Sequence, residues 1–191
     1  MNELTTVIIV IVIVLSFFLH YESKYSELTY VKSTIDNRQY LVRNVDDKQE
    51  AADMLASIRK NLDSIVAYLK ENNSHDARVE RLLSNYRPEK LSESIPNTNY
   101  TSYSVNKGEK IVFCIRSKDE KQKLVDMNTI MFVAIHELSH VATKSIGHKT
   151  EFWQNFKFLL ENAKEAGIHN PEDYKKSPKE FCSMKIHDNP Y

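Results

Sequence analysis

The chain has 191 residues, and its 26 Lys plus Arg balance its 26 Asp plus Glu, so the formal net charge at pH 7 is zero. This balance provides no general attraction to nucleic acid, which we do not expect as a partner. Three glycines and five prolines exclude a collagen-like or low-complexity chain, and the length suits a single folded domain.

The N-terminus carries an uncharged apolar segment, residues 4–21, whose centre is the aliphatic run 7–15. As a helix this segment spans about 27 Å, close to the hydrocarbon thickness of a bilayer. It lacks the basic start and the small-residue cleavage site of a signal peptide, which is one alternative beside a buried core segment. We therefore predict a transmembrane anchor over residues 1–21, with the lipid bilayer as partner, and a folded domain over residues 22–191.

The orientation of this anchor depends on two conflicting signals. Three basic residues lie between positions 24 and 38, whereas only Glu3 and the α-amino group precede the segment. The positive-inside rule therefore places the domain in the cytosol, which we favour. Two N-glycosylation acceptor patterns, which begin at Asn72 and Asn99, indicate the opposite side.

The first part of the domain combines a hairpin with helices. Residues 29–43 alternate in polarity around a polar turn and predict a β-hairpin. Apolar residues spaced three and four apart from Ala51 to Leu69 predict an amphipathic packing helix. A shorter helix is expected over residues 76–86. Residues 88–100 are polar and contain two prolines, and we expect a loop there.

A second hairpin and a connector follow. Residues 100–105 and 111–115 flank a turn that contains Gly108, and the second strand is apolar on both faces. Residues 116–123 are charged, and we expect a solvated loop.

The only two cysteines are Cys114 and Cys182, too few for a disulfide scaffold. We expect two free thiols; one disulfide is the alternative if the domain faces an oxidising compartment. Further alternatives are a second metal site in which His169 and His187 approach Cys182, and a tail in which Cys182 ligates the active-site metal and blocks the cleft.

The last part of the chain is predicted to be mainly helical. Residues 130–135 are apolar all round, which is typical of a buried helix, and this helix should run from Asp126 towards Gly147. A further amphipathic helix is expected over residues 150–167. The tail after it contains three Xaa-Pro steps and is expected to be irregular, with a short helical turn over residues 180–184.

The buried helix carries the pattern His136-Glu137-Leu138-Ser139-His140. Two imidazoles four residues apart lie one above the other on a helix and can share a zinc ion. Glu137 lies beside the pair, where a general base can take a proton from water and give it to a leaving amine. Unpaired His and Glu side chains would be costly in a buried helix, which favours a metal site over chance.

A catalytic zinc needs a third protein ligand from outside this helix. His148 is the first candidate because it follows Gly147, which lets the chain turn. Glu161 and Glu165, on the next predicted helix, are the alternatives.

The pattern at residues 136–140, followed by Gly147-His148 and then Phe152-Trp153, resembles the WLM and SprT-like zinc metallopeptidases. The chain length, the apolar N-terminus and the ending at residues 188–191 are more closely similar to membrane-anchored metallopeptidase-like proteins of large DNA viruses and protists. The resemblance implies an α+β fold, a minimal zincin-like domain with a small antiparallel sheet packed on the motif helix. It also implies Zn²⁺ at His136, His140 and His148, with Glu137 as general base. Family members commonly act on proteins crosslinked to DNA, whereas this chain has an apolar anchor and no basic excess.

We therefore expect a membrane-anchored zinc endopeptidase that acts on protein or peptide substrates. A non-catalytic membrane adaptor with a structural zinc site and a zinc hydrolase of a non-peptide bond are the alternatives. An exposed edge strand, from residues 101–105 or 109–115, could pair with an extended substrate. Tyr174 and Tyr191 are candidates for stabilising an oxyanion.

Overall fold

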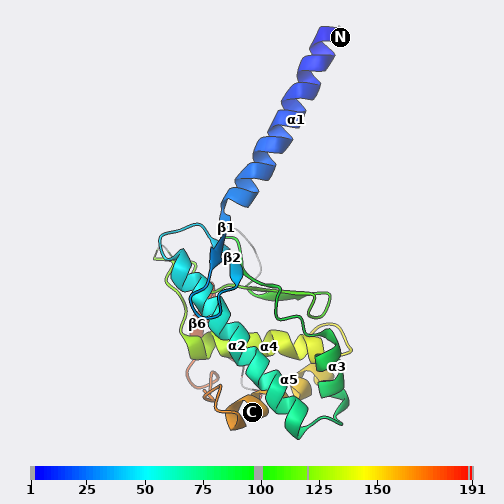
Figure 1. The fold of residues 1–191 in the computed structure, drawn as a ribbon, viewed down its shortest axis with the longest axis vertical. Coiled ribbons are helices and arrows are strands. Elements are labelled where there is room, and N and C mark those ends of the chain that lie inside the picture. The colour runs from blue at the N-terminus through cyan, green and yellow to red at the C-terminus, as the bar shows by residue number, and fades with distance from the viewer. Residues whose placement is uncertain (1–2, 97–100, 120, 189, 191) are drawn as a thin grey trace.

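The computed structural model describes residues 3–96, 101–119, 121–188 and 190, without the side chains of residues 22–26. Asn99 and Tyr191, singled out above, lie outside these residues. The described chain forms an α+β domain preceded by a long helix, α1 (Glu3–Ser26), which projects away from the domain (Figure 1).

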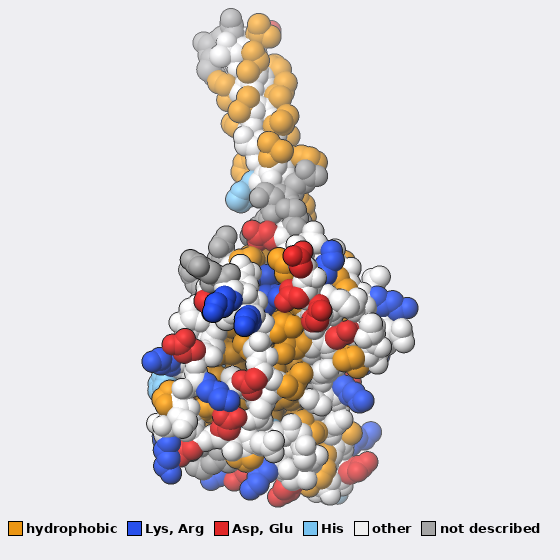
Figure 2. Space-filling view, turned by 90° about the vertical axis from the view of Figure 1, so that its left-hand side faces the viewer, with side chains coloured by type: hydrophobic (Ala, Val, Ile, Leu, Met, Phe, Trp, Pro, Cys, Tyr) orange, Lys and Arg blue, Asp and Glu red, His pale blue; other side chains and the backbone are white. Residues whose placement is uncertain are grey.

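Hydrophobic side chains cover much of the face of helix α1 that is visible in Figure 2, with one histidine near its lower end. Its residues 3–21 are long and apolar enough to cross a membrane, and none of this segment is buried by the rest of the chain. The helix therefore has the length and composition of a single membrane span. Its exposed aliphatic side chains would be unfavourable in water and favourable in a bilayer.

The larger sheet within the described residues has five short strands: β1 (Leu28–Lys32), β2 (Gln39–Arg43), β3 (Leu91–Glu93), β4 (Tyr103–Val105) and β5 (Lys110–Phe113). Their order is β1-β2-β3-β5-β4. The two expected hairpins are confirmed as the antiparallel pairs β1–β2 and β4–β5. The expectation of a wholly antiparallel sheet is wrong, because β3 pairs in parallel with both β2 and β5. A strand that returns after two helices can enter the sheet in either direction.

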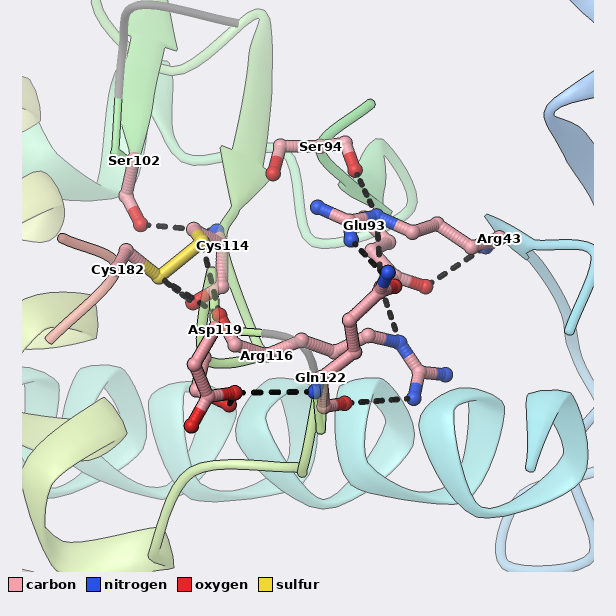
Figure 3. The surroundings of a disulfide bond; sticks show 10 residues. Arg43, Glu93, Ser94, Ser102, Cys114, Arg116, Asp119, Gln122 and Cys182 are labelled. Carbon is pink, nitrogen blue, oxygen red and sulfur yellow. Dashed lines mark hydrogen bonds and ion pairs between the residues drawn. A yellow bond between two sulfur atoms is a disulfide. The ribbon is translucent and has the colours of Figure 1, made fainter. Parts of the chain in front are cut away.

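Strand β3 lies within the segment that we expected to be a loop, and its residues are buried although two of the three are polar. Glu93 accepts a hydrogen bond from the Arg43 backbone N–H (2.7 Å) and one from Arg116 Nε (2.7 Å). Figure 3 shows Arg116 beside Glu93 and Arg43. Arg116 also pairs with Asp47, which directly precedes the helix that starts at Lys48. Arg116 is 1% exposed, so the prediction of a solvated connector is wrong for this residue, whose charge is paired with the buried Glu93 and the partly exposed Asp47.

The four helices of the domain are α2 (Lys48–Asn72), α3 (Ala77–Asn85), α4 (Met127–Ala142) and α5 (Thr150–Glu165). All four were predicted from the sequence, α4 from a run that is apolar all round and the others from the spacing of apolar residues. Helix α2 buries the apolar positions from Ala51 to Leu69, and α4 is buried almost all round. Helix α4 packs against α2, α3 and α5 and contacts β4, so the helix that carries the histidine pair lies at the centre of the domain (Figure 1).

The tail forms a separate two-stranded sheet, β6 (Lys179–Phe181) and β7 (Met184–Ile186), instead of the predicted helical turn. Cys182 and Ser183 form the turn, and both have positive φ (48° and 68°). Cys182 is joined to Cys114 by a disulfide, so the expectation of free thiols is wrong and the alternative of one disulfide holds (Figure 3). The bond ties the tail hairpin to the end of β5.

Candidate metal centre and active site

Three histidines converge at the C-terminal half of α4. The Nε2 atom of His148 lies 3.0 Å from Nε2 of His136 and 3.2 Å from Nε2 of His140. His136 and His140 share one face of α4, and His148 reaches them from the loop before α5. These three residues form the one group of potential metal ligands found among the described residues.

The rings pack against the aromatic face of α5. Phe152 is fully buried, and its ring centroid lies 4.8, 4.4 and 4.6 Å from those of His136, His140 and His148. Burial and the neighbouring imidazoles lower the pKa of His136 to about 3, and burial with the charge of His148 lowers that of His140 to about 4. Both imidazoles are therefore neutral at physiological pH, and neutral imidazole is the form that ligates a metal.

The donor set fits zinc. Three nitrogens, each about 2.0–2.1 Å from one tetrahedral ion, would lie roughly 3.3 Å apart, close to the two separations above. Neutral imidazoles that point their Nε2 atoms at one another cannot all form good hydrogen bonds, whereas a cation between them accepts every lone pair. The other candidate ligands lie elsewhere: Glu161 pairs with Lys157, and Glu165 accepts a hydrogen bond from Tyr68.

Glu137 is buried on α4 beside the histidine pair and lines the same cavity. Burial raises the pKa of its carboxyl to about 8, and a hydrogen bond from the Ser104 backbone N–H acts in the opposite direction. A nearby cation also favours the charged form. The carboxyl group is thus placed where metal binding would produce a desolvated carboxylate able to accept a proton.

The loop that carries His148 is held by charged groups that sequence reasoning missed. Glu151 accepts hydrogen bonds from the N–H groups of Lys144 and Ser145 (3.0 Å each), which lower its pKa to about 2. On the other side, Lys107 donates to the carbonyls of Thr143 (2.6 Å) and Ser145 (3.2 Å). The charge of Glu151 at the start of a helix was visible in the sequence, but its partners were not.

Two further contacts fix the end of α4. Arg81, on α3, donates to the Ala142 carbonyl (2.7 Å). Asn155, on α5, donates to the Thr143 hydroxyl (2.9 Å). The last turn of α4 is therefore bound to both neighbouring helices, which sets the position of His140 relative to His148.

The remaining candidates are not brought to the histidine group. Tyr174 is fully buried against Phe132 (ring centroids 4.8 Å apart), and His169 is buried on the same phenyl ring (6.1 Å). His187 lines the cavity wall and bonds to the Lys185 carbonyl. Cys182 is in the disulfide, so its proposed roles in a second metal site or as a blocking ligand are wrong.

The histidines and Glu137 open into a cavity of about 800 Å³. Its walls are formed by α4, by β4 with the following turn, by residues 145–148 and by the tail hairpin. Of the two candidate edge strands, only β4 lies at an edge, because β5 is paired on both sides. The edge strand, the candidate base and the histidine group thus face one space, an arrangement suited to an extended polypeptide.

Three histidines that could hold a metal ion, beside a buried carboxylate in an open cavity, are an arrangement that metallopeptidases use. The family model described as the WLM domain matches residues 33–190, so the chain belongs to the WLM domain family. This membership suggests a metalloprotease-type function.

Similar proteins occur in DNA viruses. "Uncharacterized protein R325" of Acanthamoeba polyphaga mimivirus is 36% identical over 183 residues, which cover 94% of this chain and 92% of that protein. "Uncharacterized protein 042R" of Invertebrate iridescent virus 3 is 36% identical over 83 residues, 44% of this chain and 50% of that protein. Among solved structures, Wss1 from Saccharomyces cerevisiae aligns with a TM-score of 0.49 and 22% identity, over 66% of this chain and 87% of that chain.

Proposed function

We propose that the protein is a membrane-anchored zinc endopeptidase that hydrolyses protein or peptide substrates. The observation that carries the proposal is the convergence of His136, His140 and His148 beside the buried Glu137 in a cleft bordered by an edge strand. Membership of the WLM domain family supports the same chemistry.

In this proposal the imidazoles of His136, His140 and His148 would hold Zn²⁺. Zinc in this position supplies Lewis acidity, which acidifies water and polarises a peptide carbonyl. The Glu137 carboxylate accepts the proton from water and delivers it to the leaving amine. The N–H of Ser104 orients that carboxylate, and Phe152 excludes water from the inner side of the imidazoles.

The edge of β4 is the proposed binding site for the substrate backbone. Strand β4 has β5 on one side, and residues 101–104 line the cavity that contains the histidines. An extended peptide that adds to this edge would run past Glu137 and across the mouth of the histidine group.

Helix α1 is the proposed anchor in the bilayer. The basic residues after it favour the cytosol for the domain, whereas the Cys114–Cys182 disulfide favours an oxidising compartment. We place the domain on the oxidising side, because disulfides are rare in reducing compartments. Alkylation of thiols in intact cells, before and after reduction, should show two additional modified cysteines only after reduction; two thiols modified without reductant would restore the cytosolic orientation.

Cleavage by the full chain in detergent, loaded with one equivalent of Zn²⁺, tests the proposed activity. An unfolded protein such as reduced casein is the substrate, and Glu137→Gln is the variant. We expect the wild type to cleave and the variant to be slower by about 100-fold or more, as for loss of a general base, with unchanged zinc content.

The alternatives correspond to other outcomes of this experiment. Equal zinc in both proteins with no cleavage by either would support the adaptor with a structural zinc. If the wild type leaves peptide bonds intact but hydrolyses an ester, and Glu137→Gln does not, the result would support a hydrolase of a non-peptide bond.

A further inference from the structure

The tail hairpin forms one wall of the candidate active site. Phe181, Met184, Ile186 and His187 line the cavity together with residues of β4. These residues belong to a two-stranded sheet that is separate from the five-stranded sheet of the domain. The tail hairpin therefore borders the space beside the histidine group, although it contains neither the candidate metal ligands nor the candidate base.

This wall is attached to the domain by buried side chains, by a disulfide and by the ion pairs of Lys179 with Asp126 and Glu172. A two-stranded hairpin alone is marginally stable in water, and its turn places two non-glycine residues, Cys182 and Ser183, at positive φ. The buried side chains of Phe181 and Ile186 and the Cys114–Cys182 disulfide attach it to the core (Figure 3).

The lining of the cavity as a whole is mainly apolar. Together with α4 and α5 the tail hairpin brings six large apolar side chains to the lining: Phe132, Val133, Trp153, Phe181, Met184 and Ile186. Met184 is 47% exposed, and Val133 and Trp153 are only partly buried, so apolar surface faces the cavity without cover from this chain. A flexible thioether in such a wall can adapt to side chains of different shape.

The volume of the cavity exceeds what a main chain crossing the histidine group requires. A subsite that is continuous with the reacting centre and lined by apolar groups gains affinity from burying an apolar side chain of the bound peptide. Charged residues of the wall, such as Lys185 and Asp188, lie in the same segment as the apolar ones and suit the solvated flanks of a peptide.

We propose that the disulfide-tethered hairpin β6–β7 forms a specificity subsite, with Met184 in its wall, for a bulky apolar side chain next to the scissile bond of a protein substrate. This inference rests on the proposed peptidase function and deepens it. The preferred substrates are extended polypeptide segments that carry Phe, Leu or Met at one position.

The test uses the only tryptophan in the chain, Trp153, which lines the cavity and so reports its occupancy by fluorescence. The full-length Glu137→Gln protein with Zn²⁺ is titrated with blocked octapeptides of Ala and Ser, each with a single Phe moved through successive positions. We expect one position of Phe to tighten binding by about 10- to 100-fold over the all-Ala/Ser peptide.

Two substitutions in the wall and one control complete the experiment. Met184→Ala should reduce the preference for Phe, and Met184→Glu should abolish it. Leu83→Glu, at an exposed residue of α3 outside the cavity lining, should leave it unchanged. Zinc content and thermal unfolding confirm that each variant is folded.

The outcomes separate this inference from the proposed activity. A Phe preference below about two-fold, or one that Met184→Glu does not alter in a folded protein, overturns the subsite even if the wild type cleaves peptides. A Phe preference that depends on Met184, in a protein that cleaves no peptide, supports the subsite and overturns the peptidase.

Discussion

His136 and His148 are separated by twelve residues in the sequence, yet their Nε2 atoms lie 3.0 Å apart. One histidine lies on the central helix α4 and the other in the loop before α5. The chain between them must therefore end a helix, turn back and present an imidazole at a fixed point. The residues that shape this turn should influence metal affinity without touching the metal.

Gly147 is the first such residue. Its φ is +76°, and a Cβ added there would meet nothing within 4 Å, so the cost of Gly147→Ala comes from the backbone alone, about 1–2 kcal/mol. Gly167, with φ +70° and equally open surroundings, is a matched control after α5. We expect both alanine variants to lower the melting temperature of the apoprotein, and only Gly147→Ala to weaken zinc binding in a chelator competition. Equal zinc affinities would show that Gly147 does not set the position of His148.

Glu151 is the second residue that shapes the turn before His148. Glu151→Gln removes the negative charge that holds the N–H groups of Lys144 and Ser145, so the loop before His148 becomes less ordered. We expect the dissociation constant for zinc to rise about 10-fold, at the low end of the range for groups that position ligands. Glu161→Gln on the same helix, where Glu161 pairs with Lys157, should change it little. If the zinc dissociation constant rose equally in Glu151→Gln and Glu161→Gln, the effect would come from the change in net charge and not from the loop.

The contribution of Glu151 to stability should depend on pH. Its pKa is about 2 in the folded protein against an ordinary 4.5, so its stabilising effect is present above about pH 4.5 and is lost as pH falls towards 2. In the presence of a chelator, Glu151→Gln should therefore unfold at a lower temperature than the wild type at pH 6, with the difference vanishing near pH 2. A difference that is constant over this range would contradict the assignment.

The disulfide should dominate the stability of the tail. It closes a loop with a sequence separation of 68, and removing it destabilises the folded chain by about 4 kcal/mol in the chain-entropy description. Reductant should lower the urea midpoint of the wild type towards that of Cys114→Ser/Cys182→Ser, which itself should not respond. A wild-type midpoint unaffected by complete reduction would contradict this role.

Much of the fold could be predicted because its helices have regular apolar spacing. The apolar spacing of α2 and α5, the continuous apolar run of α4 and the spacing of four between His136 and His140 are all local information. The position of His148 was inferred from Gly147 and the short distance along the chain.

The errors arose where distant residues determine the structure. Strand β3 reads as polar loop because the burial of Glu93 depends on partners distant in the sequence, Arg43 and Arg116. The tail hairpin was missed because its turn uses Cys182 and Ser183 at positive φ, where glycine or asparagine would have been the signal.

The most direct test of the three-histidine metal site is the zinc affinity of the full chain with His148→Ala beside Glu161→Ala. We predict one tightly bound zinc in the wild type and in Glu161→Ala, and an affinity lower by at least about 100-fold in His148→Ala, whose folded state is checked by circular dichroism. Wild-type zinc affinity in His148→Ala would contradict the assignment.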